Sequence, residues 1–274
     1  MSEKEKGTNG SRFREIVSVL RKHNITHGLS PKKLRLIMED LGPTFVKIGQ
    51  IMALHSDVLP KAYCDELMEL CTDARPMPFE EAVAVIDESY GRSWKKVFSS
   101  IEETPIGSAS IAQVHRAVLK TGEEVVVKIQ RKGIYEMMAR DIEFIRKAIK
   151  LMPPISLKGM ADFDLVLDEL WSVTRDEMNF LTEAANIEEF ARRNKDVNFV
   201  QTPVLYQQYT TVHVLVMEYI DGCGIDEKDK LLEDGYDLKE IGSKLVDNYI
   251  KQVMDDGFFH ADPHSGNVKI RDGK

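Results

Sequence analysis

The chain contains little of what would mark a secreted, membrane-spanning or nucleic-acid-binding protein. It has 3 cysteines among 274 residues and a net charge of -8 at pH 7, which argues against a general binder of nucleic acid or anionic membranes. No apolar run reaches the roughly 18 residues of a transmembrane helix, and the polar start, Met1–Lys6, lacks the apolar core of a secretory signal. These absences predict a cytoplasmic protein, with any membrane contact peripheral and at the inner face.

Metal-binding patterns are also scarce. Cys64 and Cys71 can share one face of a predicted helix, where thiols are more often buried apolar groups than ligands. His260 and His264 have the spacing of a zinc pair, but Pro263 between them disfavours a helix that would present both. The sequence therefore favours buried thiols and no zinc site.

What the chain does contain is the composition of a globular protein, with 43% hydrophobic and 30% charged residues. Residues 1–29 are polar, and the first ten are expected to be disordered. Apolar residues then recur at helical spacing in four segments, at about 31–41, 44–55, 62–71 and 79–90. Ser30 is the predicted N-cap of the first helix and Gly42 its end. Up to about residue 100, the regular structure is therefore expected to be entirely helical.

Beyond about residue 105, predicted strands and helices follow one another. Alternating and β-branched residues predict three strands, at about 111–119, 124–129 and 212–220. Helical spacing predicts three helices, at about 136–151, 162–193 and 238–255, the second in one or two pieces. This order predicts an α+β fold behind a helical extension.

The segment from His260 to Asn267 has the spacing H-x-D-x-x-x-x-N of a protein-kinase catalytic loop. In such a loop Asp262 would orient the attacking hydroxyl or accept its proton, Asn267 would bind magnesium, and His260 would hold the loop. The alternative is a polar turn, because Asp-Pro and Ser-Gly favour turns. The chain stops at Lys274, before the Asp of a D-F-G motif could follow. It is therefore expected to be truncated and to hydrolyse ATP poorly or not at all.

A cation for nucleotide phosphates has one clear candidate. Lys128 ends the β-branched run Val125–Val127, as the phosphate-binding lysine of kinases does; the alternative is an exposed lysine on an edge strand. An acid must orient such a lysine, and charge pattern alone does not choose among four glutamates of the long predicted helix: Glu177, Glu183, Glu188 and Glu189.

A small-residue segment precedes the first predicted strand. It consists of Gly107, Ser108, Ala109 and Ser110, and small residues allow a backbone to approach phosphates closely. It is not a G-x-G-x-x-G loop, so alone it is a weak sign of a nucleotide site.

Together these segments resemble the UbiB/AarF-like atypical protein kinase family, whose motifs occur in the family's order from about residue 30 onward. The K-x-G-Q signature stands at Lys47–Gln50 and the small-residue loop lies within Pro105–His115. The counterpart of the E-x-D stretch is Glu177–Ala184, and the loop H-A-D-P-H-x-G-N is His260–Asn267. Four motifs in one order argue against chance.

The resemblance implies a role for the residues at these positions. It makes Lys47, Lys128 and Asp262 the catalytic residues. Lys47 and Gln50 would reach into the space where a protein kinase binds its substrate, with Glu177 near Lys47.

The resemblance also implies the nucleotide contacts and the ligands. Glu183 would pair with Lys128, and the backbone of Met217, Glu218 and Ile220 would form the hinge that holds adenine. ATP and Mg²⁺ are the implied cofactors. The implied partners are isoprenoid-quinone precursors or lipids, and proteins of quinone biosynthesis.

The implied architecture is a protein-kinase-like fold in four parts. A polar segment, 1–29, precedes a helical extension with the K-x-G-Q motif, 30–104. The N-lobe, an antiparallel sheet plus helices, and the hinge would occupy 105–222. The start of a helical C-lobe with the catalytic loop would occupy 223–274.

The sequence departs from the family pattern at several places. Asn179 replaces the acid of E-x-D, which removes a charge, and Gly107 stands where many members have Ala. The D-F-G motif and the C-terminal membrane helices of many bacterial members are absent. Two alternatives stay open: a small-molecule kinase of the aminoglycoside or choline type, which would not explain Lys47–Gln50, and a catalytically inactive nucleotide-binding module.

Overall fold

A computed structural model describes residues 3–53, 56, 59–70, 75–151, 163–261, 263 and 265–274. The contacts within it divide the chain into two compact units. Unit 1 comprises Met1–Val85, Thr104–Val114 and Ile129–Met178. Unit 2 comprises Ile86–Glu103, His115–Lys128 and Asn179–Lys274.

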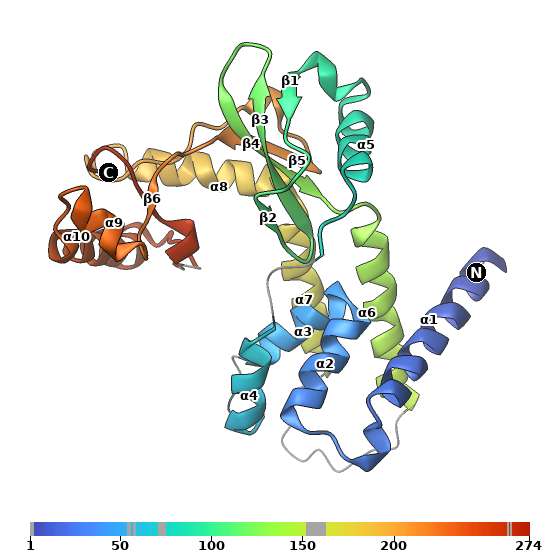
Figure 1. The fold of residues 1–274 in the computed structure, drawn as a ribbon. Helices are drawn as coiled ribbons and strands as arrows, with labels where there is room; N and C mark the ends of the chain where they lie inside the picture. The colour runs from blue at the N-terminus through green and yellow to red at the C-terminus, as the bar shows by residue number, and fades with distance from the viewer. Residues whose placement is uncertain are drawn as a thin grey trace. The chain divides into compact units, whose positions relative to one another are not determined.

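Unit 1 begins with four helices: α1 (Glu3–Lys22), α2 (Pro31–Leu41), α3 (Pro43–Ala53) and α4 (Lys61–Met68) (Figure 1). The hydroxyl of Ser30 accepts a hydrogen bond from the N–H of Lys33, and Gly42 ends α2 at a φ of 95°, which favours glycine. The three helices predicted for this stretch are confirmed over the described residues, with α4 ending at Met68; residues 54, 55 and 71 of the predicted ranges lie outside the described residues. Residues 3–10, which were predicted to be disordered, are helical, because α1 starts at Glu3; residues 1 and 2 lie outside the described residues.

A buried charge network attaches α1 to the rest of unit 1. The Arg12 guanidinium donates to both carboxylate oxygens of Asp141 at 2.8 and 2.7 Å and to the carbonyl of Leu41 at 2.7 Å. The Thr44 hydroxyl donates to the same carboxylate at 2.8 Å. Asp141 is only 2% exposed, so these donors are what makes its buried charge tolerable. This long-range contact gives α1 a tertiary partner, which the polar sequence of the N-terminus does not reveal.

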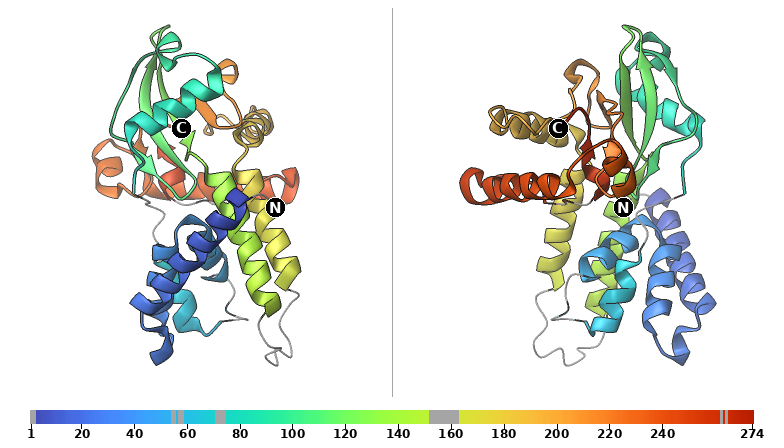
Figure 2. Two further views of the ribbon diagram at one scale, coloured as in Figure 1. Left: turned by 90° about the vertical axis from the view of Figure 1, so that its right-hand side faces the viewer. Right: turned by 60° about the vertical axis from the view of Figure 1, so that its left-hand side comes forward.

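Helices α2, α3 and α4 lie side by side around a small apolar core that includes Met38, Ala53, Leu67 and Leu70 (Figures 1 and 2). Gly49, in the K-x-G-Q motif, lies where a Cβ would collide with Leu70. The motif's glycine therefore permits the close approach of α3 to α4.

Helices α6 (Ile134–Leu151) and α7 (Phe163–Glu177), also in unit 1, pack side by side (Figure 2). Buried Ile142, Leu167 and Leu170 join them, with Ile48 of α3 against the same cluster. The helical segment predicted at about 162–193, in one or two pieces, consists of two helices, since α8 (Phe180–Arg193) begins anew after Asn179.

The sheet contains β1 (Phe98–Ile101), β2 (Gly107–Ser108), β3 (Ala112–Leu119), β4 (Glu124–Gln130) and β5 (Val214–Glu218). Its order is β1-β3-β4-β5, with β2 also on β3 and with β1 and β2 antiparallel to β3. The three predicted strands are confirmed. The expectation of helix alone up to about residue 100 is wrong at β1, which begins at Phe98, because Phe98 pairs with Leu119. The four residues of β1 carry too little alternation to predict a strand without this partner.

Unit 2 also holds α8, α9 (Lys228–Glu233) and α10 (Leu238–Lys251), and a two-stranded pairing of β6 (Cys223–Gly224) with β7 (Lys269–Ile270). Helix α5 (Phe79–Tyr90), which Gly91 follows, confirms the prediction for 79–90. The predicted helix 238–255 continues past α10 as a π-helical turn at Gln252–Asp256. Of the helices that the structure describes, none has the length and apolarity to cross a bilayer.

Candidate functional site

Lys128 lies on β4, and its side chain points to the side of the strand opposite to Val127 and Ile129. Its neighbours Val127 and Ile129 are 0% exposed, and alternation along the strand turns Lys128 to the other side. Its ammonium donates to both carboxylate oxygens of Glu183, at 2.7 and 2.9 Å. The same ammonium lies 5.0 Å from the centre of the Phe180 ring, a cation–π distance. The ammonium of Lys128 is thus held by the carboxylate of Glu183 and the ring of Phe180, both of which lie on α8 (Phe180–Arg193).

Tertiary structure selects one glutamate among the four that the sequence leaves open. Glu183 contacts Lys128, whereas Glu189 bonds to Arg192 and Arg193. Those hydrogen bonds, Arg192 first, lower the pKa of Glu189 to about 2. Glu177 belongs to unit 1 and has another partner.

The beginning of α8 fixes where Glu183 points. The side-chain oxygen of Asn179 accepts from the N–H of Leu181 at 3.1 Å, as an N-cap does. The N–H of Phe180 donates to the carbonyl of Val212 at 3.1 Å. Asn179 therefore has a structural role at the position where the family pattern has an acid. The N-cap preference of asparagine before a helix was a usable signal that sequence reasoning missed.

The other lysine of the predicted site, Lys47, lies on α3 in unit 1. Its ammonium donates to one carboxylate oxygen of Glu177, at the end of α7, at 2.6 Å. Gln50, three residues further along α3, is partly buried and on the same helical face. The K-x-G-Q lysine and its acid are thus brought together within unit 1.

The small-residue segment forms a tight turn at one end of β3. Gly107 and Ser108 pair with β3, and the N–H of Ala109 donates to the carbonyl of Ala112 at 2.8 Å; Ser110 lies inside that turn. A Cβ added to Gly107 would meet no heavy atom within 4 Å. The alanine found in many family members would therefore fit here without steric conflict.

Arg131, which sequence reasoning missed, holds this turn. Its guanidinium donates to the Ser108 hydroxyl at 2.8 Å and to the carbonyls of Ala109 and Arg75, both at 2.9 Å. These acceptors are all neutral, and burial lowers the pKa of Arg131. In the sequence, an arginine just after a strand resembles any surface cation, so only its burial reveals this contact.

The predicted hinge, Met217–Ile220, comprises the last two residues of β5 and the two residues after it, and it is hydrogen-bonded on several sides. The N–H groups of Glu218 and Tyr219 donate to the carbonyls of Val204 and Glu124, at 2.8 and 3.1 Å. The Glu218 carboxylate accepts from Arg271 at 2.8 Å, and the Ile220 carbonyl accepts from Lys269 at 3.0 Å. The strand that follows the predicted catalytic loop is therefore bonded to the hinge.

Asp262 and His264 of the predicted loop lie outside the described residues. Asn267 is exposed and ends a 3-10 turn, Ser265–Asn267, just before β7. The backbone N–H of His260 donates to the side-chain oxygen of Gln252 at 3.0 Å. At the start of the segment His260 is therefore hydrogen-bonded to Gln252, and at its end Asn267 belongs to a 3-10 turn.

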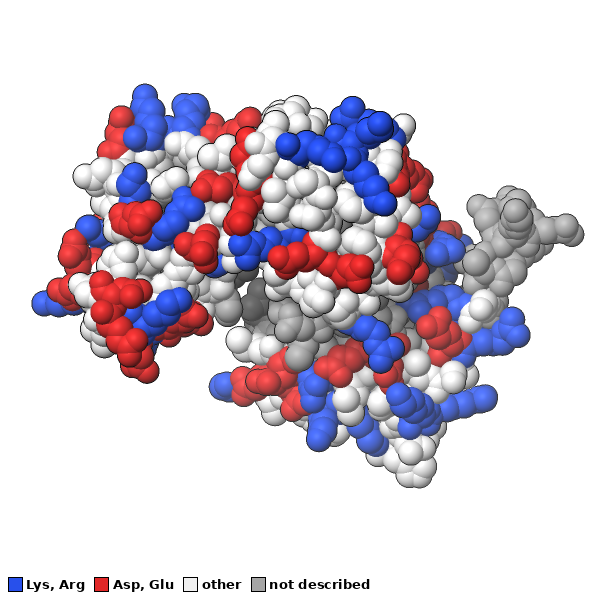
Figure 3. All heavy atoms as spheres, turned by 45° about the horizontal axis from the view of Figure 1, so that its top comes forward, with Lys and Arg blue, Asp and Glu red and all other residues white. Residues whose placement is uncertain are grey.

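Thiols and charges complete the chemistry of the described residues. Cys64 and Cys223 are buried and free, which confirms the buried-thiol prediction for Cys64; Cys71 lies outside the described residues. In the described part of the chain, no three His, Cys, Asp or Glu side chains converge as a metal site would require. Figure 3 shows basic and acidic side chains interspersed on the face drawn, without one large patch of either sign.

The architecture and these contacts define a class of protein. An antiparallel sheet whose strand lysine pairs with a helical glutamate belongs to the protein-kinase-like α+β folds, as predicted. A solved structure described as the complex of Rv3197 with erythromycin, from Mycobacterium tuberculosis, matches with a TM-score of 0.60 and 30% identity. The match covers 82% of this chain and 57% of that one.

The chain belongs to the family described as the ABC1 atypical kinase-like domain, whose model matches residues 69–274. This confirms the resemblance to the UbiB/AarF-like family and does not favour the aminoglycoside or choline kinases.

Curated relatives support the same family. An uncharacterized protein in the hydrogenase 1 5′ region of Clostridium pasteurianum is 45% identical over 89% of this chain. ACTIVITY OF BC1 COMPLEX KINASE 8, a chloroplastic protein of Arabidopsis thaliana, is 39% identical over 94% of it. A probable protein kinase UbiB of Pseudomonas fluorescens is 37% identical over 87%. The chain spans 46%, 34% and 45% of the length of these three relatives.

Proposed function

We propose that the chain is the nucleotide-binding part of a UbiB-type atypical kinase or ATPase. The observation that carries this proposal is the contact of the Lys128 ammonium with both carboxylate oxygens of Glu183, at 2.7 and 2.9 Å. A lysine fixed in direction by an acid is what a kinase uses to hold the α- and β-phosphates of ATP. Family membership supports the use of a nucleotide.

The residues present are chemically suited to ATP and Mg²⁺. Lys128 would neutralise phosphate charge, and the turn Gly107–Ser110 would offer small residues to the phosphates. Asn267 would supply an amide oxygen to Mg²⁺, an oxygen-seeking cation, and Asp262 would orient the hydroxyl or water that attacks. The hinge Met217–Ile220 would hold the adenine.

The proposal extends to partners only through the family. Relatives carry names that refer to the bc1 complex and to UbiB, so we propose isoprenoid-quinone precursors or lipids as the substrate class. Lys47 and Gln50 would belong to the helical extension, 30–104, that covers the substrate side, and Glu177 of α7 would hold Lys47 there. Contact with a membrane would be peripheral.

Titration calorimetry with Mg²⁺-ATP tests the nucleotide site in the full chain. We expect saturable binding that depends on Mg²⁺ and that Lys128→Met weakens by at least about ten-fold, because a charge contact to phosphate is lost. Lys120→Met is the matched control, since Lys120 is an exposed lysine next to the same strand pair, and its binding constant should stay within about two-fold. Absence of binding in the parent protein, or equal effects of the two changes, would refute the site.

A further inference from the structure

Three of the buried polar side chains in unit 2 are amides that are hydrogen-bonded one to the next. Asn194 follows α8, Asn248 lies on α10 and Gln252 begins the π-helical turn, and their exposed fractions are 4%, 6% and 5%. None of them belongs to the motifs discussed above. Three buried amides at one place require a reason, because apolar residues of similar size would fill the same space without any need for hydrogen bonds.

The three amides form a hydrogen-bonded row that runs in one direction. The N–H of His260 donates to the Gln252 oxygen at 3.0 Å, and the Gln252 nitrogen donates to the Asn248 oxygen at 2.6 Å. The Asn248 nitrogen donates to the Asn194 oxygen at 2.7 Å, and the Asn194 nitrogen donates to the carbonyl of Phe190 at 3.0 Å. Each amide accepts at its oxygen and donates at its nitrogen, an arrangement in which successive bonds strengthen one another. We call Asn194, Asn248 and Gln252 the amide row.

The two ends of the amide row lie at functionally different places. One end is the backbone of His260, the first residue of the H-A-D segment. The other end is the carbonyl of Phe190 on α8, the helix that carries Glu183 in its first turn. The row therefore connects the start of the predicted catalytic loop to the helix that orients Lys128.

A second set of bonds joins the same two elements beside the amide row. The Lys251 ammonium donates to the carbonyl of Arg193 at 3.1 Å and to the Asp256 carboxylate at 2.6 Å. The Arg193 guanidinium donates to the carbonyl of Asp256 at 2.6 Å. The π-helical turn thus has two parallel attachments to the end of α8. Single π-helical turns are uncommon and often lie at functional sites.

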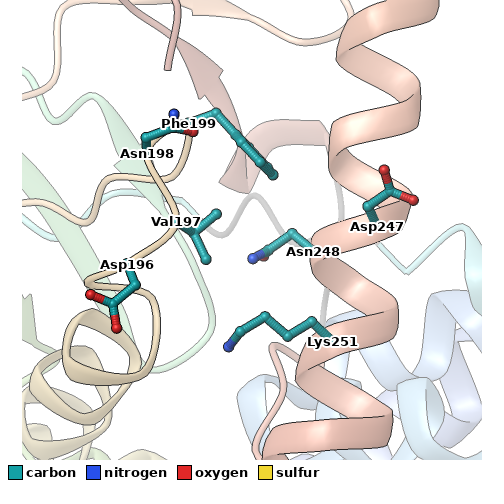
Figure 4. A pocket seen from close by; sticks show the side chains of 7 residues that line it. All are labelled: Asp196, Val197, Asn198, Phe199, Asp247, Asn248 and Lys251. Atoms are coloured by element: carbon teal, nitrogen blue, oxygen red, sulfur yellow. The ribbon is translucent and has the colours of Figure 1, made fainter.

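A cavity of about 350 Å³ borders this region on one side. Figure 4 shows Asn248 and Lys251 reaching from α10 toward the segment 196–199. The hydrogen bonds of Asn248 and Lys251 to the end of α8 therefore lie beside an open pocket and bridge α10 to that segment.

We propose that Asn194, Asn248 and Gln252 are positioning residues, which fix the start of the loop His260–Asn267 relative to α8. This inference rests on the proposed nucleotide function. A fully satisfied polar network restricts its members to one geometry, and catalytic groups misplaced by about 1 Å can lose about a hundred-fold in rate. The amide row therefore sets the position of the loop and contributes little to nucleotide affinity.

Residue-resolved hydrogen exchange of the His260 amide tests the row directly, in the full chain and without nucleotide. Gln252→Met removes the acceptor of His260 and keeps a similar shape. Asn194→Ala acts at the far end of the row and does not touch His260. We expect both variants to speed exchange at His260 by at least about ten-fold, because a local opening becomes easier.

A matched control removes a partly buried hydrogen bond elsewhere in unit 2. The Tyr90 hydroxyl donates to the carbonyl of Tyr209 at 2.6 Å, so Tyr90→Phe loses one comparable bond. Its effect on His260 exchange should stay within about two-fold even when its loss of stability matches that of the row variants. If Gln252→Met does not fold, Asn194→Ala still decides the question.

Turnover gives the second readout, well below each variant's unfolding temperature. Under the proposal, kcat for nucleotide turnover falls by about ten-fold or more in both row variants while the dissociation constant for Mg²⁺-ATP changes less than about three-fold. Lowered unfolding temperatures with unchanged His260 exchange and unchanged kcat would show that the row only supports packing. A parent protein that does not bind Mg²⁺-ATP would refute the proposed function, and the exchange result would still decide whether the row holds the start of the loop.

Discussion

The two lysine–glutamate pairs of this protein differ in geometry more than in exposure. The side chains of Lys128 and Glu183 are 26% and 35% exposed, and those of Lys47 and Glu177 are 20% and 39% exposed. Burial therefore does not separate the pairs.

The contacts separate them. Lys128 meets both oxygens of its acid and lies over the ring of Phe180. Lys47 meets one oxygen of Glu177 at 2.6 Å. A contact to both oxygens constrains the direction of an ammonium group more closely than a contact to one oxygen does. The comparison indicates that the pair of unit 2 is built to aim a charge and that the pair of unit 1 is built to attach α3 to α7.

The largest effect that would test this comparison is a matched change of the two acids. Glu183→Gln should lower nucleotide turnover of the full chain by about ten- to a hundred-fold, because Lys128 loses the charge that aims it. Glu177→Gln should lower it by no more than about three-fold. Steady-state kinetics with Mg²⁺-ATP measures both. Equal losses in the two variants would mean that both lysines act on the nucleotide.

Stability provides the control for that experiment. Both pairs are partly exposed, so each substitution should change the free energy of unfolding by about 1 kcal/mol or less, as measured by urea denaturation. A much larger loss for Glu183→Gln would assign its effect on turnover to unfolding.

A smaller effect, on stability, is expected from changes at Asn179, the N-cap of the helix α8 that carries Glu183. Asn179→Ala should reduce the free energy of unfolding by about 1 kcal/mol, because the N–H of Leu181 loses its cap. Asn179→Asp should keep the cap and the stability, since a carboxylate is favourable at a helix N-terminus. Urea denaturation of the three proteins checks this order. An Asp variant as unstable as the Ala variant would mean that Asn179 acts through its amide nitrogen.

The smallest expected effect is on the pH dependence of stability, and it arises from His115 in the sheet that also carries Lys128. His115 is fully buried on β3, and burial lowers its pKa, while its Nδ1 bonds to the carbonyl of Glu102 at 2.7 Å. A lowered folded-state pKa means that the unfolded chain binds a proton first as the pH falls. The stability held by neutral His115 is therefore full above pH about 6.5 and declines as the pH falls from there to the folded-state pKa.

A substitution isolates this contribution. His115→Asn, whose amide can donate to the carbonyl of Glu102, should remove that part of the pH dependence. Unfolding free energies of the two proteins between about pH 5 and 8 measure the difference. Parallel curves for parent and variant would exclude His115 as the source.

The helices and strands of the fold were predictable to different degrees, depending on whether local residues or distant partners form them. Helices α2, α3 and α5 follow from local apolar spacing, with Ser30 and Gly42 marking the limits of α2, and β3 and β4 follow from alternating and β-branched residues. Strand β1 was not predictable, because four residues become a strand only by pairing with β3. Helix α1 was missed for a similar reason, since its polar sequence is held by the distant carboxylate of Asp141.

The candidate site shows the same division. Sequence spacing and family resemblance identified Lys47, Lys128 and Glu183, because each lies in a recognisable motif. Arg131 and the amide row were invisible, because an isolated arginine, asparagine or glutamine has no pattern until burial removes its access to water.

The sequence by itself determined the family, the order of the motifs and the local elements, since these depend on residues close together in the chain. The tertiary structure showed that Glu183, which the family resemblance favours among the four glutamates, meets Lys128, and it alone decided which buried amides join the start of the loop to α8. Those outcomes depend on groups 54 or 55 positions apart, such as Asn194 and Asn248 or Lys128 and Glu183. The partner of a polar group is fixed by the folding of distant segments into one place, where each buried donor or acceptor must find a bond.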